Sequence, residues 1–199
     1  MTKMPATLNL YKKSILAGIL IGIGGFTYLS VDNKILGAIL FSFGLISVVI
    51  LNQKLYTGII GYVGLRRGHY YLFTTLIGNI FGAGLISLLI SPLINEQAVK
   101  IVENKLNNPL PETFIKSIIC GMLIYLAVEL YKHKQDLLCL ILPVVIFILT
   151  EAEHCIADVF YCFASCVFDI RMLYFIPICI IGNSIGSIII RWIQEEIKQ

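Results

Sequence analysis

Apolar residues fill this chain in long runs separated by short polar stretches. A helix needs about 20 mostly apolar residues to cross the hydrocarbon core of a bilayer. The second and fifth runs are too long for one helix, and polar residues interrupt them at 52–54 and at 151–154. The pattern therefore predicts an all-α membrane protein with six transmembrane helices, of which the second and fifth are broken. The six segments are 13–31, 35–51 with an extension to 65, 70–93, 113–131, 137–168 and 172–193.

The two halves of the chain share two short strings. The string KSIxxGxLI begins at Lys13 and again at Lys116, an offset of 103 residues (116 − 13). The string IGNxxG begins at Ile77 and again at Ile181, an offset of 104 residues (181 − 77). Because three spans per repeat is an odd number, the second copy must be inverted relative to the first. We expect one transmembrane domain over 1–199, with repeat one at about 13–93, an external loop at 94–112 and repeat two at about 113–193.

Composition supports a membrane location. The chain is 58% hydrophobic and 14% charged, whereas globular domains are about 45–50% apolar and about 25% charged. The net charge is only +3, and no Lys/Arg cluster alternates with aromatic residues, so nucleic acid is not an expected partner. The six cysteines lie in apolar runs, where we expect small buried hydrophobic side chains rather than a disulfide framework.

The distribution of Lys and Arg predicts the orientation in the bilayer, because loops on the cytoplasmic side carry an excess of both. With the predicted spans, nine basic residues share one side and five lie on the other. We therefore expect a multi-pass protein of the inner (plasma) membrane with both termini in the cytoplasm. The nine are Lys3, Lys12, Lys13, Arg66, Arg67, Lys132, Lys134, Arg191 and Lys198.

Ionisable residues gather at the interruption of the fifth span. Glu151, Glu153, His154 and Asp158 lie there, and a central Asp costs about 2.5–3.5 kcal/mol on insertion scales. Such residues indicate a proton or substrate pathway by default. His154 is the first candidate, because an imidazole with an ordinary pKa of about 6.5 exchanges a proton near neutrality. The alternative is a histidine that is simply hydrogen-bonded inside a helix bundle.

Thr57 follows the interruption of the second span and is the second candidate. Its hydroxyl can donate and accept, and it can face the equivalent interruption of the other repeat. The alternative, which is compatible with this one, is a capping threonine that restarts the helix. We place Glu153 and Asn183, which belongs to the second repeated string, in the same substrate pathway as Thr57 and His154.

Other chemistries are poorly supported by the sequence. Among the acidic and imidazole groups at 151–158 only His154 and Asp158 stand four residues apart, and no second histidine lies nearby. HExxH and CxxC patterns are absent, as is GxGxxG. We expect no metal, no cofactor and no enzymatic activity; an intramembrane enzyme that uses Glu153 and His154 as an acid/base pair is the weaker alternative.

Four stretches of the sequence resemble the formate/nitrite transporter family, and the resemblance covers essentially the whole chain. They are FSFGL from Phe41, LYTG from Leu55, Leu142-Pro143-Val144 through Glu153-His154 to Asp158, and Ile176-Pro177 through Asn183. The resemblance implies an aquaporin-like protomer with its own pore, assembled as a homopentamer. It also implies two apolar constrictions that flank Thr57 and His154. Carried over by position, the constriction residues are Phe41, Leu45, Leu55, Tyr56, Val128 and Phe147.

The sequence departs from the family pattern at positions near the pathway. Asn52 and Lys54 stand where the family has a glycine and an acidic residue, and Tyr56 replaces a phenylalanine. Tyr125 and Asp158 each replace an asparagine. The lysine expected before the fourth span aligns with Pro109, and the nearest substitute is Lys105.

The combined prediction is a channel or transporter for small monovalent anions of weak acids, such as formate, nitrite or hydrosulfide. A bare anion loses several kcal/mol of hydration in an apolar constriction, whereas a neutral acid crosses more cheaply. We therefore expect passage to be coupled to protonation near His154. The alternative within transport is a pore for neutral solutes such as water, ammonia or hydrogen sulfide.

Overall fold

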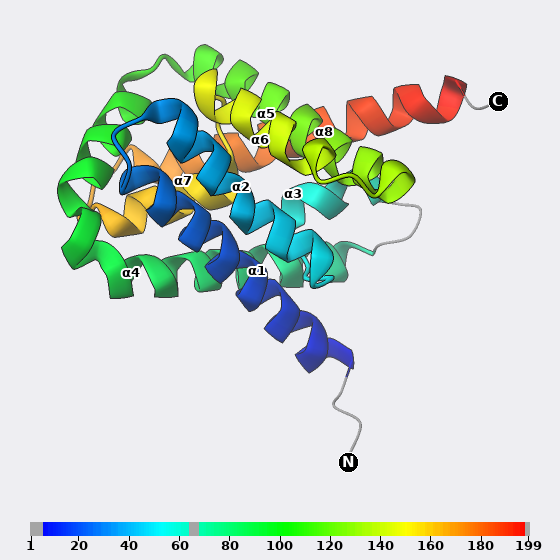
Figure 1. Ribbon diagram of the computed structural model, residues 1–199, viewed down its shortest axis with the longest axis horizontal. Coiled ribbons are helices and arrows are strands. Elements are labelled where there is room, and N and C mark those ends of the chain that lie inside the picture. The colour runs from blue at the N-terminus through cyan, green and yellow to red at the C-terminus, as the bar shows by residue number, and fades with distance from the viewer. Residues whose placement is uncertain (1–5, 64–67, 198–199) are drawn as a thin grey trace.

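The computed structural model describes residues 6–63 and 68–197, and all regular secondary structure in these ranges is helical (Figure 1). Lys3, Arg66, Arg67 and Lys198, on which the predicted orientation partly rests, lie outside these ranges, as does the end of the expected second segment at 64–65. The elements are α1 (Ala6–Leu29), α2 (Lys34–Ile50), α3 (Tyr56–Ile59), the 3-10 turn η1 (Ile60–Tyr62), α4 (His69–Asn107), α5 (Leu110–Lys134), α6 (Leu138–Leu149), α7 (Cys155–Ala164) and α8 (Met172–Ile197).

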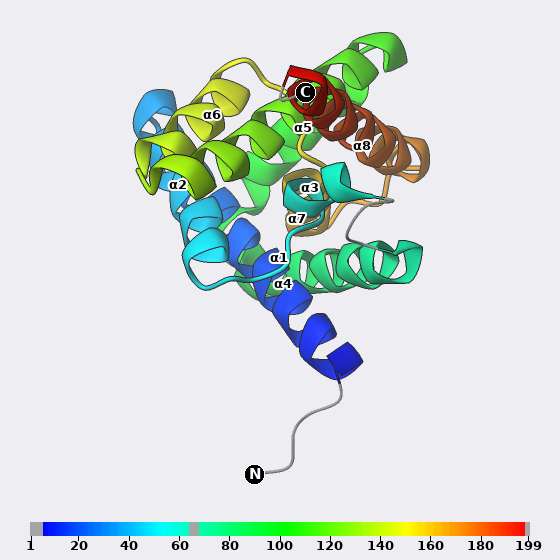
Figure 2. The same cartoon turned by 90° about the vertical axis from the view of Figure 1, so that its right-hand side faces the viewer.

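Four of the described helices, α1, α4, α5 and α8, are long and apolar enough to cross a membrane. They pack as two pairs, α1 against α4 and α5 against α8. The short helices α3 and α7 lie between the two pairs, in the middle of the molecule (Figure 2). Both short helices therefore begin at the centre of the fold, where their N-termini are buried.

Each helix pair depends on a glycine that lets two backbones approach closely. A Cβ on Gly18 of α1 would lie 2.1 Å from the carbonyl oxygen of Asn79 on α4. A Cβ on Gly121 of α5 would lie 2.1 Å from the carbonyl oxygen of Asn183 on α8. Small residues at helix interfaces allow such contact in membranes. Because the four residues belong to the repeated strings, the two halves of the chain pack in matching ways.

The interruptions at 51–55 and 150–154 also match. At the end of α2, three consecutive backbone amides centred on Asn52 donate hydrogen bonds to the carbonyls of Ser47, Val49 and Val48, in that order. At the other interruption, three consecutive amides centred on Glu151 donate to the carbonyls of Ile146, Ile148 and Phe147 in the same pattern. Asn52 has φ 51° and Glu151 has φ 55°. A residue in this left-handed conformation ends a helix and lets the chain turn back. Asn adopts it readily, whereas Glu adopts it at some cost.

An asparagine in each repeat holds the backbone where the next helix begins. Asn79 accepts a hydrogen bond from the Tyr56 amide (2.7 Å) and donates to the carbonyls of Ser14 and Lys54 (2.8 Å each). Asn183 accepts one from the Cys155 amide (2.9 Å) and donates to the carbonyls of Ser117 and Glu153 (2.7 Å each). These bonds satisfy backbone groups that an interrupted helix leaves unpaired, which membrane burial would otherwise penalise.

The expected loop at 94–112 is wrong over most of its length, because α4 continues to Asn107. Pro92 lies inside this helix without ending it. The extension buries an apolar residue at every fourth position, which gives it a face to pack on the core. Its end, near residue 105, therefore reaches the centre of the site described below. The buried residues of this face are Ile94, Ala98, Val102 and Leu106.

Candidate functional site

The interruptions of the two repeats bring Thr57 and His154 together. Thr57 Oγ1 lies 3.0 Å from His154 Nε2, and both side chains are buried. Thr57 lies in the first turn of α3, and His154 is the residue just before α7. The pair therefore sits at the centre of the molecule, where the two broken segments meet.

The other ring nitrogen of His154 is already used. Nδ1 accepts a hydrogen bond from the backbone amide of Ala157 (3.1 Å), so the imidazole caps the N-terminus of α7. An accepting Nδ1 carries no proton, which assigns the proton of the neutral ring to Nε2. His154 is thus arranged as a neutral imidazole whose N–H points at Thr57.

Aromatic rings cover one side of this polar pair. The Phe147 ring stacks on the His154 ring with centroids 5.8 Å apart and an interplanar angle of 25°. Phe41 meets Phe147 edge to face at 5.5 Å. Both phenylalanines are buried. They belong to the expected constrictions and form an apolar layer next to His154.

A first cavity of about 360 Å³ opens on the His154 side. We call it the Lys105 vestibule. It is lined by Phe147, His154 and a set of polar residues from the end of α4, the 150–154 interruption and α7. The charged residues among them are Lys105, Glu151, Glu153 and Asp158.

A second cavity of about 360 Å³ lies on the side of the other interruption, and we call it the Lys54 vestibule. Its apolar lining includes Leu45, Leu55 and Val128, three of the expected constriction residues. Its charged lining residues are Lys54 and Lys132. Lys132 bonds to Glu129 and to the Tyr62 hydroxyl, and it lies 4.4 Å from the centre of the Tyr62 ring.

The two vestibules lie at opposite ends of the fold. Asn107 and Asn108, beside the start of α5, line the first, whereas Val128, Tyr131 and Lys132 near its end line the second. A helix of the 25 residues of α5 is about 37 Å long. Buried apolar side chains and the Thr57–His154 pair lie between the two vestibules.

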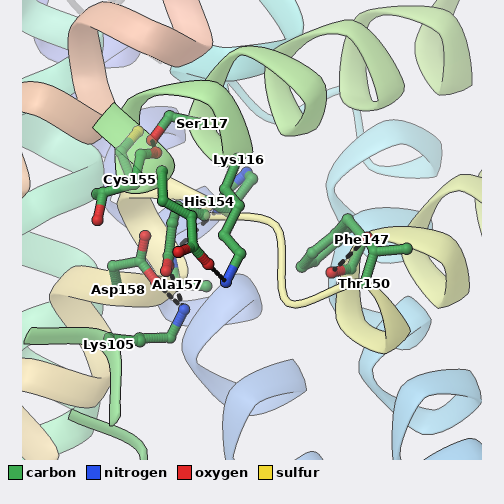
Figure 3. A network of polar contacts seen from close by, with 12 residues as sticks. Lys105, Lys116, Ser117, Phe147, Thr150, His154, Cys155, Ala157 and Asp158 are labelled. Atoms are coloured by element: carbon green, nitrogen blue, oxygen red, sulfur yellow. Dashed lines mark hydrogen bonds and ion pairs between the residues drawn. The ribbon is translucent and has the colours of Figure 1, made fainter. Parts of the chain in front are cut away.

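Lys105 bridges two carboxylates in the first vestibule. Its ammonium group forms ion pairs with Glu153 and, at 3.0 Å, with Asp158 Oδ1 (Figure 3). Arg171 fixes the end of α4 that carries Lys105, because its guanidinium donates to the Leu106 carbonyl (3.3 Å) and to Asn107 Oδ1 (2.9 Å). The position of Lys105 is therefore set by α4 and by the 165–171 segment together.

Not every residue assigned to the pathway from the sequence lines a vestibule. The Asn183 side chain is buried and bonded on all sides to backbone groups, so it supports the site from behind. The Tyr56 hydroxyl pairs with Ser184 Oγ on α8 at 2.9 Å. This bond directs the hydroxyl toward α8.

Sequence reasoning missed several residues of the vestibules, tyrosines among them. Tyr161 lines the Lys105 vestibule, and Tyr62 and Tyr131 line the Lys54 vestibule. Tyr161 follows His154 by seven residues, two turns of the same helix, and that spacing was a usable signal. Among the residues the structure describes, no group of three or more His, Cys, Asp or Glu side chains is arranged to hold a metal ion.

Known transport proteins resemble this chain in sequence. Curated relatives include the formate channel FocB of Escherichia coli (strain K12), 25% identical over 183 residues, which are 77% of this chain and 65% of that protein. The uncharacterized transporter YwcJ of Bacillus subtilis (strain 168) is 27% identical over 191 residues, 81% of this chain and 72% of that protein. The chain thus spans about two thirds to three quarters of the length of these two relatives.

Solved structures share the fold. A pentameric formate channel with formate bound superposes with a TM-score of 0.77 at 22% identity, covering 97% of this chain and 96% of the other. An ion channel of the same family gives a TM-score of 0.84 at 19% identity, covering 98% and 91% of the two chains. The sequence profile described as "Formate/nitrite transporter" matches residues 2–194. This all-helical membrane protein belongs to the formate/nitrite transporter family.

Proposed function

We propose that this chain forms a channel for small monovalent anions of weak acids, with formate as the first candidate and nitrite and hydrosulfide as others of the same class. The observation that carries the proposal is the narrow centre between the two vestibules. A hydrogen-bonded Thr57–His154 pair lies there among apolar side chains. Such a centre offers an acid a donor and an acceptor, but it offers a bare anion little replacement for its hydration.

The electrostatics at the Lys54 vestibule support an anion as the substrate. Lys54 and Lys132 line this mouth, whereas Glu129, the partner of Lys132, does not, and a cleft with a basic lining raises the local concentration of anions. An anion that reaches the centre then crosses the apolar layer more cheaply as the neutral acid. The proposal therefore includes proton-coupled passage, with the proton supplied near His154.

We extend the proposal to assembly and location. One superposed structure is a pentameric formate channel, which supports a homopentamer. The two vestibules within a single chain support one pathway in each protomer. The exposed apolar side chains of α4 suit contact with lipid or with a neighbouring protomer. The Lys/Arg distribution supports an inner-membrane protein with both termini in the cytoplasm. These exposed side chains are Phe73, Ile77, Phe81, Leu85, Leu88, Leu89 and Leu93.

A second candidate function has one observation in its favour. The lining of the Lys105 vestibule carries three carboxylates and one lysine, and negative charge repels anions at that mouth. A pore for neutral solutes such as water, ammonia or hydrogen sulfide would not be affected by this charge.

Flux into liposomes that contain the purified protein separates the two candidates. Formate and chloride are presented in equal gradients, and protein-free liposomes serve as the control. A channel for weak-acid anions passes formate much faster than chloride, because chloride has no neutral acid form near neutrality. Equal rates for formate and chloride, or water and ammonia flux without formate flux, would contradict the proposal.

A further inference from the structure

The Lys105 vestibule holds more negative charge than its lysine can neutralise. The Glu153 and Asp158 carboxylates both contact the one ammonium group of Lys105. Glu153 is 0% exposed and Asp158 is 1% exposed. A buried carboxylate without its own counter-charge costs several kcal/mol, so it takes up a proton instead.

The other lysines near this vestibule have acidic partners of their own. Lys34 pairs with Glu151 at 2.9 Å, and Lys116 pairs with Glu112 at 2.7 Å. Each of these pairs contributes one positive and one negative charge. Around the vestibule, within residues 6–63 and 68–197, the unbalanced group is therefore the set of Lys105, Glu153 and Asp158.

A second observation points to a shared proton at this place. Glu153 Oε1, Asp158 Oδ2 and the Tyr161 hydroxyl are buried and have no hydrogen-bond partner among the described residues. All three residues line the same cavity as His154. Buried polar atoms that lack partners are normally satisfied by ordered water, and the O–H of a protonated carboxyl can serve as the donor to a neighbouring carboxylate.

We propose that Glu153 and Asp158 share one proton at neutral pH, and that this pair gives the proton to the passing anion and takes it back. The inference deepens the proposed function, on which its transfer step rests. In that step the O–H bond of the carboxylic acid breaks and an O–H bond forms on the substrate anion. The pair is left as two carboxylates on Lys105, and a proton from water in the vestibule restores it.

The position of the pair suits this exchange. Glu153 immediately precedes His154, and Asp158 lies one helical turn after it. The pair thus borders both the open vestibule, which supplies protons, and the narrow centre, where the neutral acid is needed. His154 then acts as a positioning donor through Nε2, because protonating Nδ1 would break its bond to the Ala157 amide.

Apart from His154, whose Nδ1 is held by the Ala157 amide, the other titratable groups near Asp158 do not match a step near neutrality. Most are thiols and phenols, which ordinarily lose a proton only above about pH 8. Lysine is ordinarily charged throughout this range. The groups that face the pair are Lys105 from α4, Tyr28 from α1, Cys120 from α5, His154, Cys155, Tyr161 and Cys162 from the start and body of α7, Cys179 from α8, and Glu151 with Lys34 at the rim.

Asp169 in the 165–171 segment does not supply the proton either. The Arg171 guanidinium holds the pKa of this exposed carboxyl below its ordinary value. A carboxyl whose pKa is lowered by folding stabilises the folded protein. This stabilisation is fully present above the unfolded pKa of about 3.9 and is lost only as the pH falls through the lower, folded pKa. Asp169 therefore stays ionised between about pH 5 and 8.

Infrared difference spectroscopy of the assembled protein at neutral pH tests the shared proton without any transport assay. A protonated carboxylic acid has a carbonyl stretch that an ionised carboxylate lacks. We expect this band in the wild type and its loss in both Asp158→Asn and Glu153→Gln. Glu112→Gln is the matched control, because it removes a lysine-paired carboxylate that lines neither vestibule, and it should keep the band. A wild type without the band overturns the inference, as does a band that survives in both vestibule variants.

Formate flux between about pH 5 and 8 tests the transfer step. We expect the midpoint of the pH dependence in Asp158→Asn to move by about one pH unit or more. The reason is that a neighbouring like charge shifts the pKa of a carboxyl by an amount of that order. If the Asp158→Asn variant assembles and its midpoint is unchanged, the pair does not transfer the proton to the substrate. A wild type that shows the carboxylic acid band but carries no formate contradicts the proposed function and leaves the shared proton supported.

Discussion

His154 Nε2 lies 3.0 Å from Thr57 Oγ1, and the two residues come from equivalent interruptions in the two repeats. Neither residue could reach the other if α2 or α6 continued as an unbroken helix. The hydrogen bond is therefore a direct product of the two interruptions. In the proposed pathway a passing solute would have to replace this bond.

Thr57→Val should reduce formate flux by about tenfold or more. The two side chains have similar shapes, but valine leaves His154 Nε2 without a partner, and an unsatisfied buried donor costs about 1–3 kcal/mol. Thr57→Ser is the matched control, because it keeps the hydroxyl, and we expect its flux to be close to that of the wild type. Initial rates in liposomes at a fixed protein content measure both. Equal rates for the valine and serine variants would show that the hydroxyl has no part in passage.

His154→Asn should keep the pH dependence of flux while reducing its rate. Asparagine is among the best residues for capping a helix N-terminus, so α7 should still begin at residue 155. The titration remains because, on the inference above, it belongs to Glu153 and Asp158. His154→Phe removes both the cap and the polar centre, so its flux should fall further. Flux between about pH 5 and 8, with size-exclusion chromatography as a check on assembly, distinguishes the variants.

A flat pH profile in His154→Asn would instead identify the imidazole as the titrating group. The control for the loss of a cap alone is Asn33→Ala. Asn33 caps α2 by accepting a hydrogen bond from the Leu36 amide at 3.0 Å. It lines neither vestibule. Its removal should cost about 0.5–2 kcal/mol of stability without changing the pH profile of flux.

Tyr56→Phe should leave the order of substrates unchanged. The hydroxyl points to Ser184 on α8, and Ser184 keeps its own bond to the Ile180 carbonyl at 2.6 Å. The variant should therefore lose only about 1 kcal/mol of stability, the typical net value of one hydrogen bond. Thermal unfolding in detergent and flux ratios for formate, nitrite and acetate measure the two effects. A changed ratio would place the hydroxyl in the pathway after all.

Gly121→Ala should prevent assembly or lower the unfolding temperature sharply. The new methyl group would lie 2.1 Å from the Asn183 carbonyl oxygen, so α5 and α8 would have to separate. Gly84→Ala on α4 is the matched control, because its nearest contact would be an ordinary 3.7 Å from the Phe163 ring. An interior helical Gly→Ala change without a clash is favourable by about 1 kcal/mol. If both variants unfold at the same temperature, close packing of the pair is not what limits stability.

The sequence predicts the central architecture because its main signals are local. Long apolar runs, the polar residues inside two of them and the repeated strings KSIxxGxLI and IGNxxG are all visible without a structure. The strings also mark the packing contacts, since they contain Gly18 and Asn79 in one half and Gly121 and Asn183 in the other. The role of each asparagine was not predictable. It depends on where the backbone of the other broken segment passes, which is a tertiary contact.

The end of α4 shows how competing local signals can mislead. Asn, Glu and Pro residues after residue 92 favour a loop, whereas the apolar residues at positions 94, 98, 102 and 106 favour a helix. The segment is helical, because a helix buries these apolar residues against the core. This helix determines the site, because it places Lys105 in contact with Glu153 and Asp158. These two residues lie 48 and 53 positions further along the chain (153 − 105 and 158 − 105).

The duplicated backbone places residues of opposite character at equivalent points of the two repeats. Asn79 binds the carbonyl of Lys54, and Asn183 binds the carbonyl of Glu153, so these two residues occupy equivalent places in the two repeats. One is a basic residue that lines one mouth, and the other is an acidic residue, paired with Lys105, that lines the opposite mouth. A passive pore cannot drive solute in one direction, so permeability at low concentration is the same both ways. We expect the two mouths of the proposed channel nevertheless to saturate at different anion concentrations, so that flux rectifies when one side is rich in substrate.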